Sequence, residues 1–360
     1  MGFAGIRVGL VGPLPPPAGG MANQTRQLSE LLQAAQAQVT LVQTNAPYRP
    51  QWVGRIPGVR AAFRLLPYLT ALWRAAGRSD VLHIMANSGW SWHLFAAPAI
   101  WIARWRGVPV VVNYRGGEAA EFLQGAQTVV RQSVATTARL LVPSAFLQQV
   151  FARFGMQAEI VPNIIDLTRF HPRAGRLAAS AHLMVARNLE ALYDNGTAIR
   201  AFQAVQVQWP QAVLTIAGSG PQEAELRQLV ADLGLQACVY FAGRLDRDGM
   251  AALYRQADIM LNPSLADNMP NSVLESMASG VPVVSTNVGG VPYIVQDGVT
   301  ALLVPPANPP AMAAACLRLL GDPDLWTRLQ QAGLAQVQRY TWSQVAPVLA
   351  AHYRQAIQAK

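Results

Sequence analysis

Residues 261–290 of the chain read LNPSLADNMPNSVLESMASGVPVVSTNVGG. We expect a strand, a polar loop that carries Asp267, a short helix that begins near Pro270 and ends at Gly280, a buried strand, and a double-glycine turn. Proline is favoured in the first turn of a helix and glycine just past its end, so both boundaries have a local cause. The loop therefore leads into a helix N-terminus, where backbone amides and the helix dipole favour an anion such as a phosphate.

Two carboxylates, Asp267 and Glu275, lie on either side of this helix start. Carboxylate oxygens are strong hydrogen-bond acceptors and suit the hydroxyl groups of a sugar. A phosphate site beside two such carboxylates indicates an activated sugar as ligand.

The composition predicts a globular protein of two domains. The chain has 360 residues, of which 52% are hydrophobic and 13% charged, which is enough to bury two cores of ordinary size. The formal charge is +9, and Lys360 is the only lysine. Any side chain that binds a phosphate through a positive charge is therefore arginine, which does so with two parallel hydrogen bonds. Nucleotide composition of the source genome explains the arginine bias equally well.

Several classes of protein are disfavoured by what the sequence lacks. No basic run with interleaved aromatic residues indicates nucleic-acid binding. Cys238 and Cys316 lie in an apolar strand and an alanine-rich helix, where we expect them to pack as small core residues in a reducing compartment. We see no signal-peptide pattern and no run of 18 apolar residues, so we expect a cytoplasmic protein without a membrane-spanning helix.

Strands and helices alternate in two halves of the sequence, which predicts an α/β protein with two doubly wound parallel sheets. We expect an N-terminal domain over residues 1–165 and a second domain over 166–340. A C-terminal helix over 341–360 is expected to pack back on the first domain, with a kink or break at Pro347. The predicted strands cover 6–12, 38–43, 80–85, 109–114, 140–143 and 159–163 in the first half, and 182–186, 212–217, 239–242 and 301–304 in the second.

One stretch, residues 58–78, is both basic and strongly apolar. Four arginines alternate there with large apolar side chains, which would let the segment lie in an anionic membrane interface. The alternative is a core helix whose arginines reach out to water, kinked near Pro67. The helix expected over 90–105 is rich in tryptophan and is a second candidate for the interface. The residues concerned in the first stretch are Arg60, Phe63, Arg64, Leu65, Leu66, Leu69, Leu72, Trp73, Arg74 and Arg78.

The stretch 262–290 resembles the nucleotide-sugar signature of the GT-B glycosyltransferases of the family 4 type, also described as glycosyl transferases group 1. Further matches are spread over most of the chain. The resemblance implies two Rossmann-like domains with a cleft between them, the first binding the acceptor and the second the nucleotide sugar. The matching positions outside 262–290 are Gly12 with Gly19-Gly20, Pro143-Ser144, Pro162-Asn163 with Asp166 and Phe170, and Gly218 with Gly220-Pro221.

The resemblance implies roles for both acidic residues. At the first acidic position, which contacts the donor sugar, this chain has Asp267 where glutamate is usual, and one methylene less would suit a different sugar or pose. Glu275 would contact the ribose. The backbone amides of Asn268 and Met269 would face the sugar and the diphosphate, with Asn271 also in the donor site.

The resemblance also implies cationic and catalytic groups. Arg187 fits the arginine that holds the diphosphate, whereas Asn195 stands at the usual lysine position. Arg244 or Arg115 would therefore have to supply the missing positive charge. His83 is a candidate catalytic histidine, although a single strand histidine is more often packed than functional. Met85 stands where a second histidine is usual. Gly19, Gly20 and Gly218 would let backbone approach the donor closely.

A metal is not implied. Asp246 and Asp248 form a pair of a kind that holds a divalent ion in another glycosyltransferase fold, but Asp248 precedes a helix and is better explained as its N-cap. We therefore expect no metal and no cofactor other than the nucleotide-sugar substrate.

The sequence predicts a retaining glycosyltransferase that moves a sugar from a nucleoside diphosphate donor to a glycan or lipid-linked acceptor, in polysaccharide or cell-envelope synthesis. An anionic membrane surface is a further expected partner, which would place the protein at the inner face of the membrane. Two alternatives stay open, which are a nucleotide-sugar epimerase on the same fold and a non-catalytic binding subunit.

Overall fold

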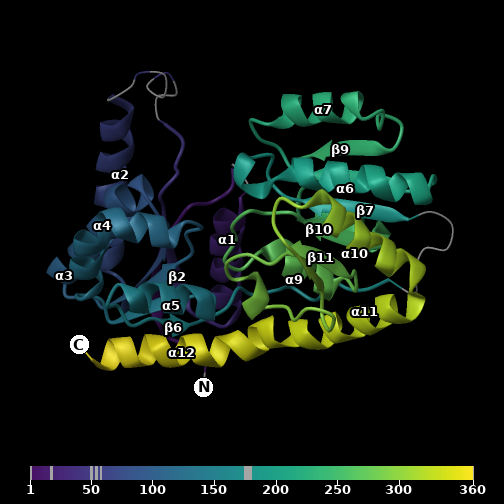
Figure 1. Ribbon diagram of the computed structural model, residues 1–360. Coiled ribbons are helices and arrows are strands. Elements are labelled where there is room, and N and C mark those ends of the chain that lie inside the picture. The colour runs from purple at the N-terminus through teal and green to yellow at the C-terminus, as the bar shows by residue number, and fades with distance from the viewer. Residues whose placement is uncertain are drawn as a thin grey trace. The chain divides into compact units, whose positions relative to one another are not determined.

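The structure is a computed structural model that describes residues 2–16, 19–48, 52, 56, 59–173 and 181–359, without the side chains of 59–62. Gly58 and the Arg60 side chain, both in the predicted basic stretch, lie outside the described part. The chain forms two compact units (Figure 1). Unit 1 contains residues 1–164 and 342–360, and unit 2 contains residues 165–341.

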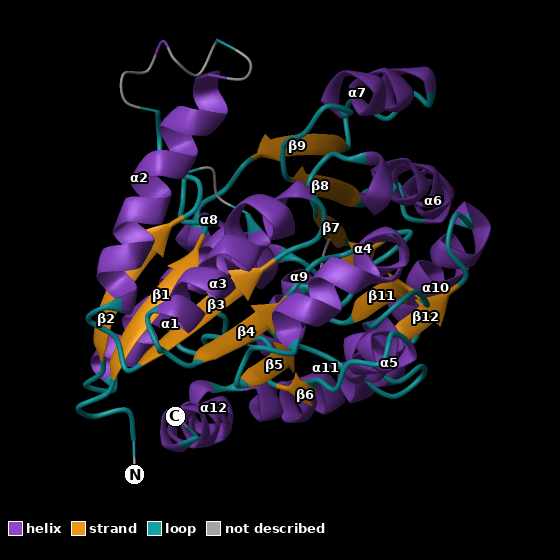
Figure 2. Cartoon of the chain, turned by 90° about the vertical axis from the view of Figure 1, so that its left-hand side faces the viewer, coloured by secondary structure: helices purple, strands orange, loops and turns teal. Residues whose placement is uncertain are grey.

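Unit 1 is built on a six-stranded parallel sheet with the strand order β2-β1-β3-β4-β5-β6. Val8 of β1 pairs with Val39 of β2 on one side and with Val81 of β3 on the other, so β1 lies inside the sheet (Figure 2). Strand β3 is buried along its whole length, which is typical of a parallel sheet covered on both faces. The strands are β1 (Arg7–Gly12), β2 (Gln38–Gln43), β3 (Val81–Ala86), β4 (Val110–Tyr114), β5 (Arg139–Val142) and β6 (Glu159–Ile160).

Helices cover both faces of this sheet. Alternate strand residues such as Ile84 and Val112 pack with α2, α3, α4 and α5 in one apolar cluster. Their neighbours, such as Met85 and Val111, pack on the other face with α1 and α12. The period of two along each strand therefore supplies both cores. The helices are α1 (Gly20–Ala34), α2 (Val59–Ala76), a π-helical segment η2 (Trp92–Ala96), α3 (Ala97–Trp105), α4 (Ala119–Val134), α5 (Ala145–Arg153) and α12 (Trp342–Gln358).

The last helix, α12, belongs to unit 1 and runs through Pro347 without a break (yellow in Figure 1). Of the predicted kink or break at this proline, the break was wrong. Proline removes one backbone hydrogen bond, but Leu349 and Tyr353 beyond it are fully buried in the core of unit 1. This packing keeps the part of the helix that follows Pro347 in place against the sheet.

Unit 2 repeats the architecture with a parallel sheet in the order β12-β11-β10-β7-β8-β9. One face carries α6, α7 and α10, and the other carries α8 and α9. The strands are β7 (His182–Ala186), β8 (Val213–Ala217), β9 (Val239–Gly243), β10 (Ile259–Asn262), β11 (Val283–Thr286) and β12 (Leu302–Val304). The helices are η3 (Ala191–Tyr193), α6 (Asn195–Gln208), α7 (Glu223–Asp232), α8 (Arg247–Gln256), α9 (Asn271–Ala278), η4 (Val291–Tyr293), α10 (Pro309–Gly321), α11 (Pro323–Val337) and η5 (Gln338–Tyr340).

Both sheets confirm the predicted α/β class with two doubly wound, Rossmann-like folds. Helix α9 begins after Pro270, which is its N-cap, and ends before Gly280, whose φ of 67° favours glycine. Ser144 is the N-cap of α5, since its hydroxyl accepts a hydrogen bond from the Leu147 amide.

The prediction that Asp248 is the N-cap of the helix α8 was wrong. Asp246, and not Asp248, caps this helix, because the Asp246 carboxylate accepts a hydrogen bond from the Gly249 amide at 2.8 Å. Asp248 lies in the first turn of the helix, is exposed, and forms an ion pair with Arg169. The helix begins at Arg247, so Asp248 lies inside it and does not precede it.

Candidate active site

Arg187 stands at the carboxyl end of β7, and its guanidinium group is fixed from two sides. Its Nε donates a hydrogen bond to Asn262 Oδ1 at 2.7 Å, and its Nη2 forms an ion pair with Asp267. The ring of Tyr193 lies under the guanidinium carbon at 5.1 Å. The ion-paired side chains of Arg187 and Asp267 are only 11% and 13% exposed. The structure thus brings two predicted donor-site residues into direct contact.

Gly218 and Gly220 hold the loop that carries Arg187. A Cβ on Gly218 would lie 1.9 Å from the Arg187 carbonyl oxygen, and one on Gly220 would lie 2.3 Å from that of Leu189. The Arg187 amide also donates to the Ala217 carbonyl at 3.1 Å. Only glycine allows this approach, so the motif acts on the site by positioning Arg187.

A second pair of glycines holds the loop of Asp267 in the same way. A Cβ on Gly289 would lie 2.1 Å from the Asp267 carbonyl oxygen, and one on Gly290 would lie 1.7 Å from that of Asn268. The Gly290 amide donates to the Asp267 carbonyl at 2.8 Å. The turn that closes the opening stretch of sequence therefore packs on the loop that begins it.

Burial raises the pKa of the Asp267 carboxyl, although the neighbouring Arg187 opposes the shift. The Asn268 amide donates to the same carboxylate at 3.0 Å. A buried carboxylate is stable only when it is paired and hydrogen-bonded, and Asp267 is both.

Glu275 lies on α9, where its carboxylate is removed from most of the solvent. Burial raises its pKa from 4.5 to about 7, while the hydroxyl of Tyr254 and the charges of Arg247 and Arg187 lower it. The Tyr254 hydroxyl lies 3.2 Å from Glu275 Oε2 and 3.0 Å from the carbonyl oxygen of Ser272. Arg187 thus acts electrostatically on both carboxylates, which places all three groups in one site.

Two residues of this site, Arg247 and Tyr254, were not found from the sequence. They lie seven residues apart on α8, so they share one face of that helix. Arg247 also lies 3.8 Å from Asp166. The spacing of an arginine and a tyrosine on one helical face was the available signal, and it is too common to have been decisive.

The remaining predicted donor residues of unit 2 are placed less favourably. Asn195 is fully buried, and its amide group donates to the Asn188 carbonyl at 2.9 Å, so it supports the Arg187 loop rather than facing a ligand. Arg244 is exposed directly after β9. Met269 packs in the apolar core behind the loop. Asn271 opens α9 and is partly exposed.

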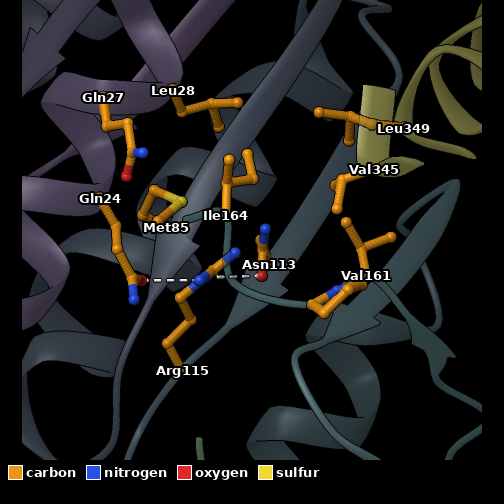
Figure 3. A pocket seen from close by; sticks show the side chains of 11 residues that line it. Gln24, Gln27, Leu28, Met85, Asn113, Arg115, Val161, Ile164, Val345 and Leu349 are labelled. Carbon is orange, nitrogen blue, oxygen red and sulfur yellow. Dashed lines mark hydrogen bonds between the residues drawn. The ribbon is translucent and has the colours of Figure 1, made fainter. Parts of the chain in front are cut away.

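In unit 1, Gly19 and Gly20 stand at the start of α1, where an added Cβ would meet no atom within 4 Å. Arg115 follows β4 and is surrounded by amide oxygens (Figure 3). It donates to Gln24 at 2.6 Å, to Asn113 at 3.1 Å and to Asn163. Burial lowers the pKa of Arg115 to about 10.

Arg115 lines a small cavity of about 10 Å³ in unit 1 (Figure 3). Such a volume holds roughly one water molecule. Because a sugar ring needs far more room, this cavity as it stands is no sugar site. Its lining residues are Gln24, Gln27, Leu28, Met85, Asn113, Arg115, Val161, Pro162, Ile164, Val345 and Leu349.

His83 lies in the middle of β3 and is completely buried. One ring nitrogen, Nδ1, is 2.8 Å from the Tyr353 hydroxyl, and Nε2 is 3.3 Å from the Asn113 amide group. Burial, with a contribution from the charge of Arg115, lowers its pKa to about 3. A neutral histidine with both nitrogens engaged inside the core favours the packing alternative over contact with a substrate.

The described residues contain no group of three or more His, Cys, Asp and Glu side chains placed to hold a metal ion. Within the same part of the chain, no helix is long and apolar enough to cross a membrane.

Arg187, Gly218, Arg244 and the Asp267 loop follow the carboxyl ends of four parallel strands of unit 2, which are β7, β8, β9 and β10 in that order. Ligands of doubly wound sheets bind at this edge. Two such sheets in one chain are the architecture of the GT-B class of glycosyltransferases. The structure is similar to sucrose-phosphate synthase from Thermosynechococcus elongatus, with a TM-score of 0.79 and 22% identity over 99% of this chain and all of that one.

The family follows from the sequence comparisons. Residues 181–322 match "Glycosyl transferases group 1", and residues 18–169 match "Glycosyltransferase Family 4". The chain therefore belongs to the group 1, family 4 type of glycosyltransferases.

The curated relatives carry names of the same kind, and a second structural neighbour was solved with UDP. An MMP alpha-(1->4)-mannosyltransferase from Mycolicibacterium hassiacum is 30% identical over 71% of this chain and 61% of its own length. Over four curated relatives, this chain spans between 47% and 61% of their length. The structure of HepE from Anabaena, in complex with UDP, matches with a TM-score of 0.73 and 16% identity over 96% of this chain and 99% of that one.

Proposed function

We propose that the chain is a retaining glycosyltransferase that moves a sugar from a nucleoside diphosphate sugar to a glycan or lipid-linked acceptor. The placement of Arg187, Asp267 and Glu275 around the entrance to α9 carries this proposal. A guanidinium group beside a helix N-terminus suits a diphosphate, and two carboxylates suit the hydroxyls of the ribose and the transferred sugar. The UDP bound by HepE supports a nucleoside diphosphate as the ligand.

The ion pair between Arg187 and Asp267 gives the donor site a definite resting state. Arginine has five N–H donors, and two groups of Arg187, Nε and Nη2, already bind Asn262 and Asp267. We propose that a diphosphate takes Nη2 from Asp267, because a group with two negative charges competes well with one carboxylate. Asp267 is then released to accept hydrogen bonds from the donor sugar.

In this proposal Arg187 stabilises the diphosphate as it leaves and its negative charge grows. A fixed positive group contributes most when it is already oriented before the reaction. The Gly218 and Gly220 contacts provide this orientation, since they hold the backbone of the loop in place.

Glu275 accepts hydrogen bonds from the ribose in its charged form. Its pKa of about 7 means that nucleotide affinity falls as the pH drops below neutrality. Tyr254 and Arg247 both lower the pKa of Glu275 and so favour its charged form. They act as positioning residues for this carboxylate. Unit 1 is proposed to hold the acceptor.

The first experiment measures release of nucleoside diphosphate by the purified chain from common nucleotide sugars, with glycan and lipid acceptor extracts. The anomeric configuration of the product, read by NMR, tests retention. Release of no nucleoside diphosphate with any donor and acceptor would contradict the proposal.

The second experiment separates the roles of the ion pair. Asp267→Asn should bind nucleoside diphosphate roughly tenfold more tightly, because Arg187 no longer has a competing partner, and should transfer sugar poorly. Arg187→Ala in the Asp267→Asn background leaves no unpaired buried carboxylate and should lose this gain. Arg227→Ala removes an exposed ion pair with Glu223 and serves as the matched control. Weaker nucleotide binding by Asp267→Asn would refute the competition between Asp267 and the diphosphate.

A further inference from the structure

Helix α2 has a buried face and an exposed apolar face. Tyr68 and Leu72 pack in the core of unit 1. On the other side, Phe63, Leu66 and Trp73 are 44%, 65% and 46% exposed. These three residues recur at spacings of three and seven, so they form one stripe along the helix. The sequence-based alternative of a simple core helix accounts for only half of α2.

Helix α3, which packs beside α2, carries two further exposed tryptophans. Trp101 and Trp105 are 50% and 74% exposed and lie one turn apart. Helices α2 and α3 lie on the same side of the unit 1 sheet (Figure 2). The guanidinium of Arg106 stacks over the Trp73 ring at 4.8 Å and so joins the two helices. We call Phe63, Leu66, Trp73, Trp101 and Trp105 the aromatic face.

The segment that carries the aromatic face is rich in positive charge. Residues 59–107 contain six arginines and a single acidic residue, Asp80. Asp80 is bound by Arg7, whose Nη2 lies 2.6 Å from its carboxylate. Arg74, Arg78, Arg104 and Arg106 are all exposed. The aromatic face is therefore bordered by positive charge that the segment itself does not neutralise.

We propose that the aromatic face docks on an anionic lipid surface. Tryptophan prefers the boundary between headgroups and acyl chains, and exposed arginines are attracted by anionic headgroups. Exposed aromatic residues in a cluster mark an interaction site. A protein partner would instead need an acidic surface that complements these arginines.

The test uses the full chain without donor, mixed with phosphatidylcholine vesicles that contain or lack phosphatidylglycerol. We expect sedimentation with the anionic vesicles, weakened by salt as surface electrostatics requires. Trp101→Ser with Trp105→Ser should lower vesicle binding at least tenfold, since both rings leave the interface. Arg74→Gln and Arg104→Gln should each lower it about fivefold, the factor that corresponds to one interfacial arginine.

Val207→Ser is the matched control, because Val207 is 74% exposed but lies in unit 2. It should leave vesicle binding unchanged. Absence of binding to anionic vesicles at low salt, or full binding by the tryptophan variant, overturns the proposal. All the substituted side chains are exposed, so far-UV circular dichroism should be unchanged. Turnover with a water-soluble acceptor should also be unchanged, which separates this proposal from that of the transferase reaction.

Discussion

Replacing Glu275 by glutamine should stabilise the ligand-free protein above pH 7 and weaken its binding of nucleoside diphosphate. In the folded chain the Glu275 pKa is raised from 4.5 to about 7, chiefly by burial. Between these two values the unfolded chain releases a proton that the folded chain keeps. Stability therefore falls as the pH rises through this window, and the loss is complete above pH 7.

The size of the effect follows from the same two values. They differ by 2.5 pH units (7 − 4.5), and each unit corresponds to about 1.4 kcal/mol, which gives about 3 kcal/mol as an upper limit. Glutamine keeps an oxygen that can accept the hydrogen bond from Tyr254, and it carries no charge to bury. The free energy of unfolding of Glu275→Gln should exceed that of the unchanged chain by up to about 3 kcal/mol at pH 8.

The assay is denaturant unfolding of both proteins at pH 4 and at pH 8, without nucleotide. At pH 4 both side chains are neutral in the folded and largely in the unfolded chain, so the two proteins should be nearly equally stable. Glu225→Gln, on the exposed surface of α7, is the control and should change little at either pH because water solvates its carboxylate. A Glu275→Gln protein that is less stable at pH 8 would refute the argument from burial.

Three further outcomes are expected. Gly290→Ala, whose Cβ would lie 1.7 Å from the Asn268 carbonyl oxygen, should cost about 3 kcal/mol in unfolding free energy and weaken nucleotide binding measured by calorimetry. In Gly20→Ala the added Cβ would have no atom within 4 Å, so the fold should not be destabilised. A loss of turnover with an unchanged denaturation midpoint would show that a ligand comes close to this glycine. Unchanged turnover would show that none does. Asp246→Ala should cost about 1 kcal/mol by removing the α8 cap, and Asp248→Ala less than that, because its ion pair is exposed; the reverse order in urea unfolding would contradict the cap assignment.

The sequence by itself determined the two doubly wound sheets and the reaction class. Alternation of short apolar strands with helices is a local pattern, and it predicted strands such as 38–43 and 182–186 with their observed bounds. The opening stretch also marked Asp267 and Glu275, because carboxylates beside a helix start are visible in sequence order. These features depend on residues that are close along the chain.

Only the tertiary structure decided how the marked residues act. Arg187 and Asp267 are 80 residues apart, and their ion pair exists because β7 and β10 are neighbours in the sheet. The Gly218 and Gly290 contacts, the support of Glu275 by Tyr254 and the burial of His83 by Tyr353 likewise join distant segments.

The same reason applies to the aromatic face. The sequence showed arginines and tryptophans in 58–78 and 90–105 but left open whether they were core or surface. Exposure is a property of the folded chain, since it depends on which helix faces the sheet. The packing of Leu72 inward and of Trp73 outward settled it.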